Sequence, residues 1–456
     1  MNALEPVLLK ELNETDYESL ISYRIRKILM ICSNYDAFIL EEDGQIESQI
    51  FKEYIDLNLS NPPKFIWVQT AAEARELLNT VVGIDMVMCM YNVSDKEVFT
   101  LAADMKAERP NLPFVLLTHF SKEVYRRLAH QNTSAIDYMF CWYGNADLIM
   151  AIVKLFEDLQ NAEHDILGVG VQAILLVEDS VRYYSTYLPE LYKLVLMQTR
   201  EFLTETLNEQ QRKIRKRSRP KILLATNYED ALHMYEKYKN NLLGVISDVG
   251  FALHHDEGVE KEVLDAGINL VRHIKEDDPM MPVLLQSSQA SVASVAQELK
   301  VGFLKKYSKT LMLQLSDYIK EEFGFGDFVF RDDSRKEYGR AGNLKELEAL
   351  VRTVPDDVLL KATSKNMLSK WFYARGLFTL GGTVKAVQES QFATVHEMRQ
   401  YVSQQIHDFH ALMGRGVIAH FDTENYGTHI WFSRMGDGSL GGKARGLAFL
   451  NSLVDK

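Results

Sequence analysis

Four charged residues between positions 178 and 306 follow directly after short apolar runs. Glu178 and Asp179 follow AILLV, Asp248 follows LLGVIS, and Lys306 follows GFLK. The carboxyl ends of parallel strands meet at one edge of a sheet, so we expect these side chains to converge. Three converging carboxylates repel one another unless a cation lies among them, and hard oxygen ligands of this kind suit Mg²⁺.

The same set of residues is suited to phosphoryl transfer. The carboxylate of Asp248 is a candidate nucleophile that would form an acyl phosphate. Lys306 would neutralise charge on the phosphoryl oxygens, and Ser287, which follows PVLLQ, would donate a hydrogen bond to one of them. We therefore expect a phosphoacceptor site that uses Mg²⁺.

Alternating apolar runs and amphipathic stretches must position these residues. From Arg26 to about Asn161 the alternation gives five strand–helix units, and it starts again at AILLV. This order predicts two tandem α/β domains, each a five-stranded parallel sheet with helices on both faces. Past Phe330 the helical stretches follow one another without intervening strands, which predicts a small, mostly helical domain.

These patterns divide the chain into five predicted segments. They are an N-terminal extension (1–22), a first α/β domain (23–165), a second α/β domain (166–326) with a long helical insertion (181–217), a helical connector (327–432) and the start of a further domain (433–456).

The insertion at 181–217 is longer than ordinary strand–helix connections and contains Pro189, so we expect an interrupted helix that projects from its domain. Its apolar stripe would suit a partner helix and indicates a homodimer contact. The stripe consists of Leu191, Leu194, Val195, Phe202 and Leu207. The basic run from Arg212 to Lys221 is more typical of a solvated helix end than of a nucleic-acid patch.

The second α/β domain resembles the receiver domain of two-component response regulators, a flavodoxin-like fold. The match lies in the acidic pair Glu178 and Asp179, the phosphoacceptor Asp248, the hydroxyl residue Ser287 and the lysine Lys306. The resemblance implies phosphorylation of Asp248 by a sensor histidine kinase or a small phosphodonor.

The resemblance also implies two further roles. The Mg²⁺ site would include the backbone carbonyl of Gly250 beside the three carboxylates. Phe303 matches the family's switch aromatic, three residues before the lysine, which assigns the lysine role to Lys306 and not to Lys305.

The first α/β domain repeats the fold pattern without the chemistry. At the corresponding strand ends it carries Cys32 and Ser33, then Met90, and finally Cys141, and only Thr118 matches the family. These side chains can neither bind Mg²⁺ nor accept a phosphoryl group. This copy resembles a pseudo-receiver that is retained for packing or partner contact.

Composition limits the binding partners and the cellular compartment that we expect for the protein. Hydrophobic residues make up 46% of the 456, and the formal net charge of −12 argues against binding to nucleic acid or to an anionic membrane. The three cysteines lie in apolar runs and are expected to be reduced core thiols. Neither a secretory leader nor a membrane-spanning stretch is evident, so we expect a cytoplasmic protein.

The C-terminal run GDGSLGGKARGLAFLN satisfies G-x-G-x-x-G from Gly436 to Gly441, but lacks the following elements of a dinucleotide fold. Its Lys443 follows paired glycines at a predicted helix N-terminus. The string resembles the opening of the ATP-grasp domain of phosphoenolpyruvate synthase and pyruvate phosphate dikinase. The resemblance implies that Lys443 contacts ATP, and that ATP is a cofactor only where that domain is completed.

Three hypotheses follow from the sequence. The leading one is a response regulator-type module, phosphorylated on Asp248, that regulates an attached or associated phosphoenolpyruvate synthase-like output domain. The second is the N-terminal fragment of an ATP-dependent phosphotransferase of that family. The third is an inert dimeric scaffold. Because no complete catalytic domain is recognisable, the sequence leaves enzyme activity open.

Overall fold

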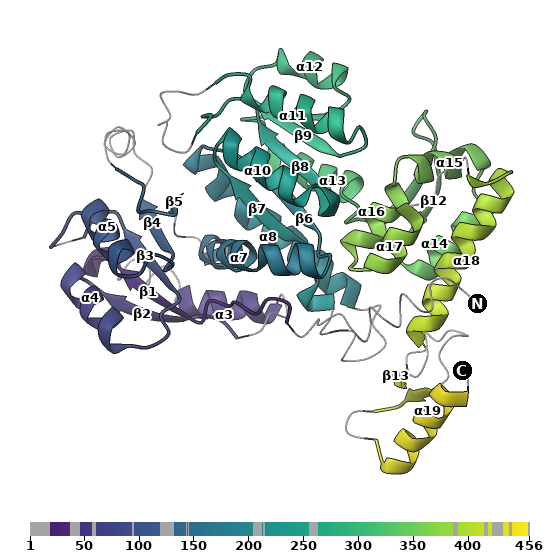
Figure 1. The fold of residues 1–456 in the computed structure, drawn as a ribbon, viewed down its shortest axis with the longest axis horizontal. Coiled ribbons are helices and arrows are strands. Elements are labelled where there is room, and N and C mark those ends of the chain that lie inside the picture. The colour runs from purple at the N-terminus through teal and green to yellow at the C-terminus, as the bar shows by residue number, and fades with distance from the viewer. Residues whose placement is uncertain are drawn as a thin grey trace.

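The computed structural model shows two α/β units, a mostly helical part and a short C-terminal piece (Figure 1). The described residues are 19–36, 46–56, 61–93, 95–118, 132–142, 144, 146–203, 212, 215–254, 263–385, 391–414, 418–421, 432–436 and 440–454.

The first α/β unit is built on a five-stranded parallel sheet of order β2-β1-β3-β4-β5. Its strands are β1 (Lys27–Ile31), β2 (Lys64–Val68), β3 (Met86–Met90), β4 (Phe114–Thr118) and β5 (Tyr138–Cys141). Its helices are α3 (Ile46–Asp56), α4 (Ala71–Thr80), α5 (Val98–Glu108) and α7 (Ala146–Ala162), followed by the π-helix η1 (Glu163–Gly168). Every residue of β3 and β4 is buried, as in strands covered on both faces.

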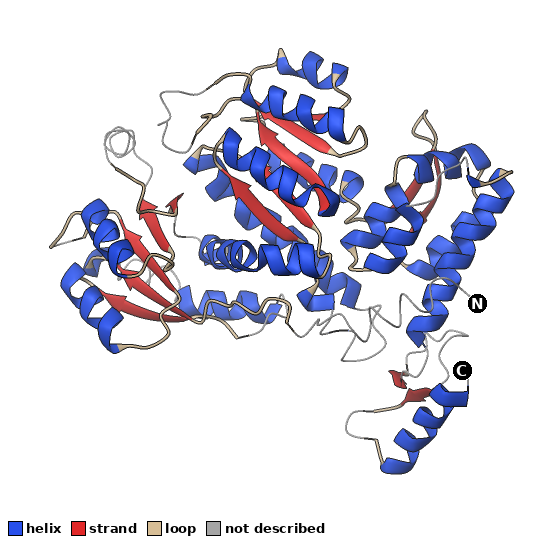
Figure 2. Cartoon of the chain, in the orientation of Figure 1, coloured by secondary structure: helices blue, strands red, loops and turns tan. Residues whose placement is uncertain are grey.

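The second α/β unit repeats this topology, with sheet order β7-β6-β8-β9-β10. Its strands are β6 (Ala173–Val177), β7 (Lys221–Ala225), β8 (Leu242–Asp248), β9 (Val283–Ser287) and β10 (Gly302–Lys305). Its helices are α8 (Val181–Phe202), α10 (Tyr228–Tyr238), η3 (Lys239–Asn241), α11 (Ala266–Asp277), α12 (Val292–Glu298) and α13 (Leu311–Glu322). Helices flank the strands of each unit (Figure 2). The predicted fold class, two flavodoxin-like α/β sheets, is confirmed.

The helix α8 differs from the sequence expectation. It runs unbroken through Pro189, and it packs on α7 of the first unit instead of projecting. Leu191, Val195 and Phe202 of the apolar stripe are buried, and Leu194 is partly buried, while Leu207 lies outside the described residues. The stripe thus contributes to a core cluster that continues through both sheets of the same chain. The apolar stripe of an amphipathic helix indicates that another surface covers it. Here that surface belongs to the same chain.

The end of the basic run is also buried, contrary to the expectation of a solvated helix end. Arg219 donates to both carboxylate oxygens of Asp158 on α7, at 3.0 and 2.8 Å. The Lys221 ammonium lies 2.6 Å from an oxygen of Asp165, and the Tyr192 hydroxyl donates to Asp158 at 2.9 Å. Burial alone would raise the pKa of Asp158, but Arg219 and Lys221 hold it below its usual range. This ion cluster joins the two α/β units.

Beyond α13 the chain forms a mostly helical part with its own core. Its helices are α14 (Leu344–Thr353), α15 (Asp356–Ser364), α16 (Met367–Ala374), α17 (Phe378–Lys385) and α18 (Val395–Gly414). The expectation of no strands past Phe330 is wrong, because β11 (Phe328–Arg331) pairs antiparallel with β12 (Glu337–Ala341). The sequence of β12, EYGRA, is polar and mostly exposed, so it lacks the alternation that indicates a strand.

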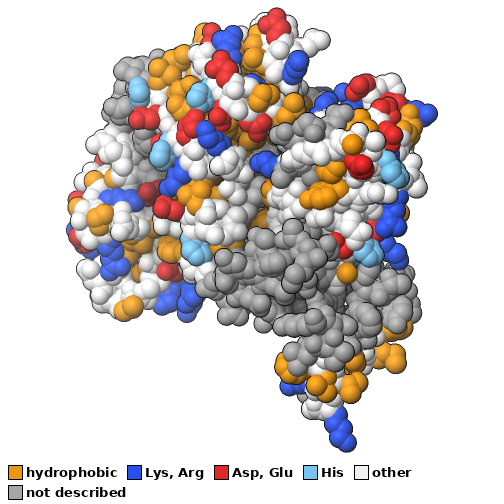
Figure 3. Space-filling view, turned by 45° about the vertical axis from the view of Figure 1, so that its right-hand side comes forward, with side chains coloured by type: hydrophobic (Ala, Val, Ile, Leu, Met, Phe, Trp, Pro, Cys, Tyr) orange, Lys and Arg blue, Asp and Glu red, His pale blue; other side chains and the backbone are white. Residues whose placement is uncertain are grey.

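The C-terminal piece contains β13 (Ile418–His420), β14 (Phe432–Arg434) and α19 (Gly442–Val454). At the bottom of Figure 3, apolar side chains lie on its surface, and Leu447, Phe449 and Leu450 are exposed. All three cysteines are buried and none forms a disulfide, as expected. No helix in the described ranges combines the length and hydropathy needed to cross a lipid bilayer. The domain boundaries stay predictions.

Candidate functional site

The carboxyl ends of β6, β8, β9 and β10 bring the five predicted site residues together. Asp179, Asp248, Ser287 and Lys306 line one cavity of about 310 Å³. Glu178 lies behind them, with 1% of its side chain exposed. The convergence follows from the parallel order, because the residues at the carboxyl ends of parallel strands all lie at the same edge of the sheet.

The ammonium of Lys306 holds the centre of this site. It donates to Glu178 Oε2 at 2.8 Å and to Asp248 Oδ2 at 2.5 Å. The Lys306 side chain is 5% exposed, whereas its neighbour Lys305 points to solvent. The backbone N–H of Lys306 donates to Ser287 O at 2.9 Å, which fixes this residue against β9. The structure thus places Lys306, and not Lys305, beside the carboxylates.

The three carboxylates form a compact cluster. Oxygens of Glu178, Asp179 and Asp248 all lie within 4.8 Å of one another, and no other set of three or more His, Cys, Asp or Glu side chains among the described residues is arranged in this way. Three carboxylates and one ammonium leave a formal charge of −2, which a divalent cation would balance. The donor set, oxygen only, fits Mg²⁺.

The electrostatics of the cluster support the same conclusion. Burial and the neighbouring charge of Asp248 raise the pKa of Glu178 to about 8, because the charged carboxylate has lost its water and lies beside like charge. Burial alone would lower the pKa of Lys306, but Glu178 and Asp248 raise it above its usual value. The raised pKa of Glu178 means that, without a further cation, this carboxyl tends to keep its proton near neutral pH, so the formal charge of −2 counts Glu178 as ionised.

Other groups orient the reactive side chains. Asp248 Oδ1 accepts from the backbone N–H of Val249 at 2.7 Å, so each of its oxygens has a partner. Ser287 Oγ accepts from the Gln289 N–H at 3.1 Å, which leaves its own proton available to donate. Gly250 is buried and contributes to the cavity wall. Phe303 is partly buried and packs against the core cluster that contains Val283 and Leu285.

Three tyrosines around Lys306 were not identified from the sequence. The Tyr183 ring centroid lies 4.2 Å from the Lys306 ammonium. Tyr187 stacks on Tyr183, and Tyr307 meets Tyr183 edge to face. A usable signal existed, because Tyr183 lies one helical turn after Asp179 and Tyr307 follows Lys306 directly.

The first sheet places its counterparts in the same way, but they are apolar or neutral. Cys32, Met90, Thr118 and Cys141 are each at most 4% exposed. Thr118 and Cys141 are cross-strand partners at the ends of β4 and β5. Ser33 donates to the Asp36 carboxylate at 2.7 Å, within the loop after β1. In the described part of the chain, this edge holds no acidic cluster.

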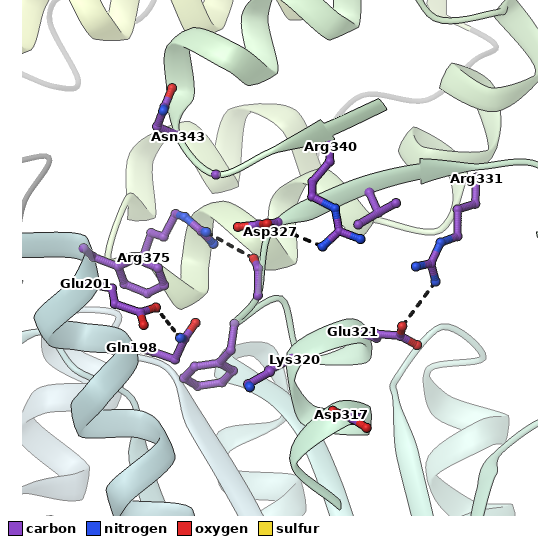
Figure 4. Close-up of a pocket in the computed structure, with 15 residues that line it drawn as sticks. Gln198, Glu201, Asp317, Lys320, Glu321, Asp327, Arg331, Arg340, Asn343 and Arg375 are labelled. Atoms are coloured by element: carbon purple, nitrogen blue, oxygen red, sulfur yellow. Dashed lines mark hydrogen bonds and ion pairs between the residues drawn. The ribbon is translucent and has the colours of Figure 1, made fainter. Parts of the chain in front are cut away.

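A larger cavity, of about 680 Å³, lies between α8, α13 and the β11–β12 hairpin (Figure 4). Its charges balance: the basic residues are Lys320, Arg331, Arg340 and Arg375, and the acidic residues are Glu201, Asp317, Glu321 and Asp327. Arg331 pairs with Glu321 at 3.2 Å and Arg340 pairs with Asp327 at 3.5 Å. This cavity lacks the concentrated charge of the acidic site, so the smaller cavity is the better candidate.

At the C-terminal glycine run, α19 begins at Gly442 and places the exposed Lys443 in its first turn. Residues 437–439 of the run lie outside the described residues. The ATP contact of Lys443 stays a prediction.

No family model matches the sequence, and no curated protein matches it. Two proteins are among the solved structures that are similar to the chain. One is described as a putative two-component system response regulator/GGDEF domain protein (15% identity), the other as a probable two-component system response regulator/GGDEF domain protein (14% identity). Each comparison covers 65% of this chain and 98% of the other, with a TM-score of 0.28. This similarity is too low to indicate a function for this chain.

Proposed function

We propose that the chain is a phosphoacceptor module of the two-component type, phosphorylated on Asp248. The observation that carries the proposal is the Lys306 ammonium between Glu178 and Asp248, at 2.8 and 2.5 Å, in a carboxylate cluster with a formal charge of −2. A purely structural ion pair needs one carboxylate for one ammonium, whereas this site gathers three.

Exposure favours Asp248 over Glu178 as the nucleophile. The Asp248 side chain is 14% exposed and faces the cavity, while Glu178 is 1% exposed and lies behind Lys306. An oxygen of Asp248 forms a bond to phosphorus as the bond from phosphorus to the donor oxygen or nitrogen breaks, and the donor keeps that electron pair. Lys306 neutralises charge on the phosphoryl oxygens, and the Ser287 hydroxyl donates to one of them. Phe303, partly buried, is the proposed switch residue.

Glu178, Asp179 and Asp248, with the carbonyl of Gly250, are the proposed ligands of Mg²⁺. When bound, the cation would offset the repulsion among the carboxylates and the charge of the arriving phosphoryl group. The proposed partner is a sensor histidine kinase or a small phosphodonor.

The test is intact-mass measurement after incubation with Mg²⁺ and acetyl phosphate. We expect one phosphoryl adduct on the natural protein, none on Asp248→Asn, and none when EDTA replaces Mg²⁺. A matched control is Asp265→Asn, since Asp265 lies just before α11 and does not line the cavity. An adduct that persists in Asp248→Asn would overturn the proposal.

A phosphoenolpyruvate synthase-like output is a separate proposal that rests on the sequence resemblance around Lys443 alone. If this proposal is correct, ATP binds the full protein, and the substitution Lys443→Met weakens that binding. Equal binding by both proteins in equilibrium dialysis would contradict it.

A further inference from the structure

The cavity over Asp248 combines a charged floor with an apolar rim. Asp179, Asp248 and Lys306 form the floor, while Leu264 and Tyr307 belong to the same lining. Leu264 is 63% exposed and Tyr307 is 73% exposed, although both are large apolar side chains. Exposed apolar groups that border a pocket, and are not scattered over the surface, commonly mark a contact with a ligand or partner.

The Tyr307 ring is supported from inside the protein. It meets the Tyr183 ring edge to face, at 5.8 Å between centroids and 68°. Tyr183 in turn stacks on Tyr187, at 5.8 Å and 27°, and Tyr187 is 1% exposed. A column of three rings therefore runs from the core to the rim, so that Tyr307 presents a pre-organised surface.

The backbone at Tyr307 is held in an uncommon conformation. Its φ of +68° lies in the left-handed region, which favours glycine and disfavours a bulky side chain. The preceding residue, Lys306, is fixed by the hydrogen bond from its backbone N–H to Ser287 O. The hydrogen bonds from its ammonium to the carboxylates of Glu178 and Asp248 also hold it in place. The left-handed turn at Tyr307 thus comes directly after the residue that holds the site together.

We propose that Tyr307, with Leu264, is a specificity-determining residue that favours phosphodonors whose leaving group is a flat aromatic ring over donors with a small acyl leaving group. This inference rests on the proposed function of Asp248. An imidazole ring offers a face that packs on Tyr307, and its protonated form is attracted to a tyrosine face and to the acidic floor. Acetate offers neither.

The transfer is balanced for such a donor. An oxygen of Asp248 forms a bond to the phosphorus of N-phosphoimidazole as the phosphorus–nitrogen bond breaks. The electron pair of that bond stays on the imidazole nitrogen, and the ring, already protonated on its second nitrogen, leaves as neutral imidazole. The rim contacts this leaving ring, whereas Lys306 contacts the phosphoryl oxygens.

The test compares rate constants of adduct formation with N-phosphoimidazole and with acetyl phosphate, on the full chain with Mg²⁺. We expect the ratio of the two rate constants to fall about three- to tenfold in Tyr307→Gly, the size of one aromatic contact, and to be kept in Tyr307→Phe. Lys300→Gly is the matched control, because Lys300 also has a positive φ, +56°, but does not line the cavity.

An unchanged ratio in Tyr307→Gly, with adduct still forming on Asp248, would overturn this inference alone. Absence of any adduct from either donor on the natural protein would overturn the proposed function instead. Should Tyr307→Gly fail to fold, Tyr307→Asn provides the same test, since asparagine tolerates the left-handed region and lacks an aromatic ring.

Discussion

The two α/β units share one strand order, but the carboxyl ends of their sheets are opposites. The first ends in Cys32, Met90 and Cys141, all buried and uncharged. The second ends in carboxylates and a lysine within hydrogen-bonding distance of one another. Since the same fold forms with either set, the charges of the second sheet are not required for folding. Their concentration in one unit is the strongest argument that they serve a function.

Met90→Asp, which gives the first sheet a carboxylate at the position that corresponds to Asp248, should have the largest effect of the substitutions considered. It places a carboxylate at a site that is 2% exposed, in a unit that carries Cys141 where the second unit carries Lys306, so we expect a loss of about 3 kcal/mol or more in the free energy of unfolding. Chemical denaturation measures the loss, with Met90→Leu as the control at less than about 1.5 kcal/mol. A stable Met90→Asp protein that gains a second phosphoryl adduct would contradict our view of the first sheet as inert.

Lys306→Met should have the next largest effect. It removes the cation next to the phosphoryl group, and we expect phosphorylation of Asp248 to slow by about 10²- to 10³-fold. Lys305→Met is the matched control, since it removes the same charge one residue away, on an exposed side chain. Time-resolved intact mass follows both. Equal slowing in the two variants would mean that net charge, not position, controls the rate.

Asp179→Asn should stabilise the protein in the absence of divalent cations. Removing one of three mutually repelling carboxylates is expected to raise the free energy of unfolding by about 1–2 kcal/mol in EDTA, as is common where function demands strain. The advantage should shrink in Mg²⁺, which the natural protein binds more tightly than the variant. Denaturation in the two buffers makes the comparison, and a variant less stable than the natural protein in EDTA counts against a functional cluster.

Tyr138→Phe should have the smallest effect. The Tyr138 hydroxyl on β5 donates to Leu224 O on β7 at 3.0 Å, so it joins the first sheet to the second. We expect a loss of about 1 kcal/mol in the free energy of unfolding, the usual worth of such a bond. Tyr35→Phe, at an exposed tyrosine, is the control. If both variants match the natural protein, the hydroxyl contributes nothing to the joining of the sheets.

The sequence predicted what strand order alone decides. Glu178, Asp179, Asp248, Ser287 and Lys306 could be placed at one edge because parallel strands leave no other arrangement. The position of the Tyr307 ring could not be predicted in the same way, because it depends on the sign of one backbone angle, although the spacing of Tyr183 from Asp179 offered a usable signal. A periodicity argument contains no information on that angle.

The errors concern partners that are remote in sequence. The stripe of α8 suggested a dimer contact and the basic run a solvated helix end, yet the stripe contributes to a core within the chain and Arg219 binds Asp158 of α7. A homodimer stays a prediction. Arg219 and its partner Asp158 are 61 positions apart. A charged or apolar pattern has the same appearance in sequence whether its partner is water, another chain or a distant helix of the same chain.

The ion cluster of Asp158, Arg219 and Lys221 has a consequence for how such proteins can be rearranged in evolution. Asp158 belongs to α7 of the first unit, whereas Arg219 and Lys221 belong to the second unit. All three side chains are at most 3% exposed. A gene fusion that carried only the second unit into a new protein would leave two buried cations without their counter-charge. The two α/β units should therefore be inherited as a pair, with substitutions on one side of the cluster matched on the other.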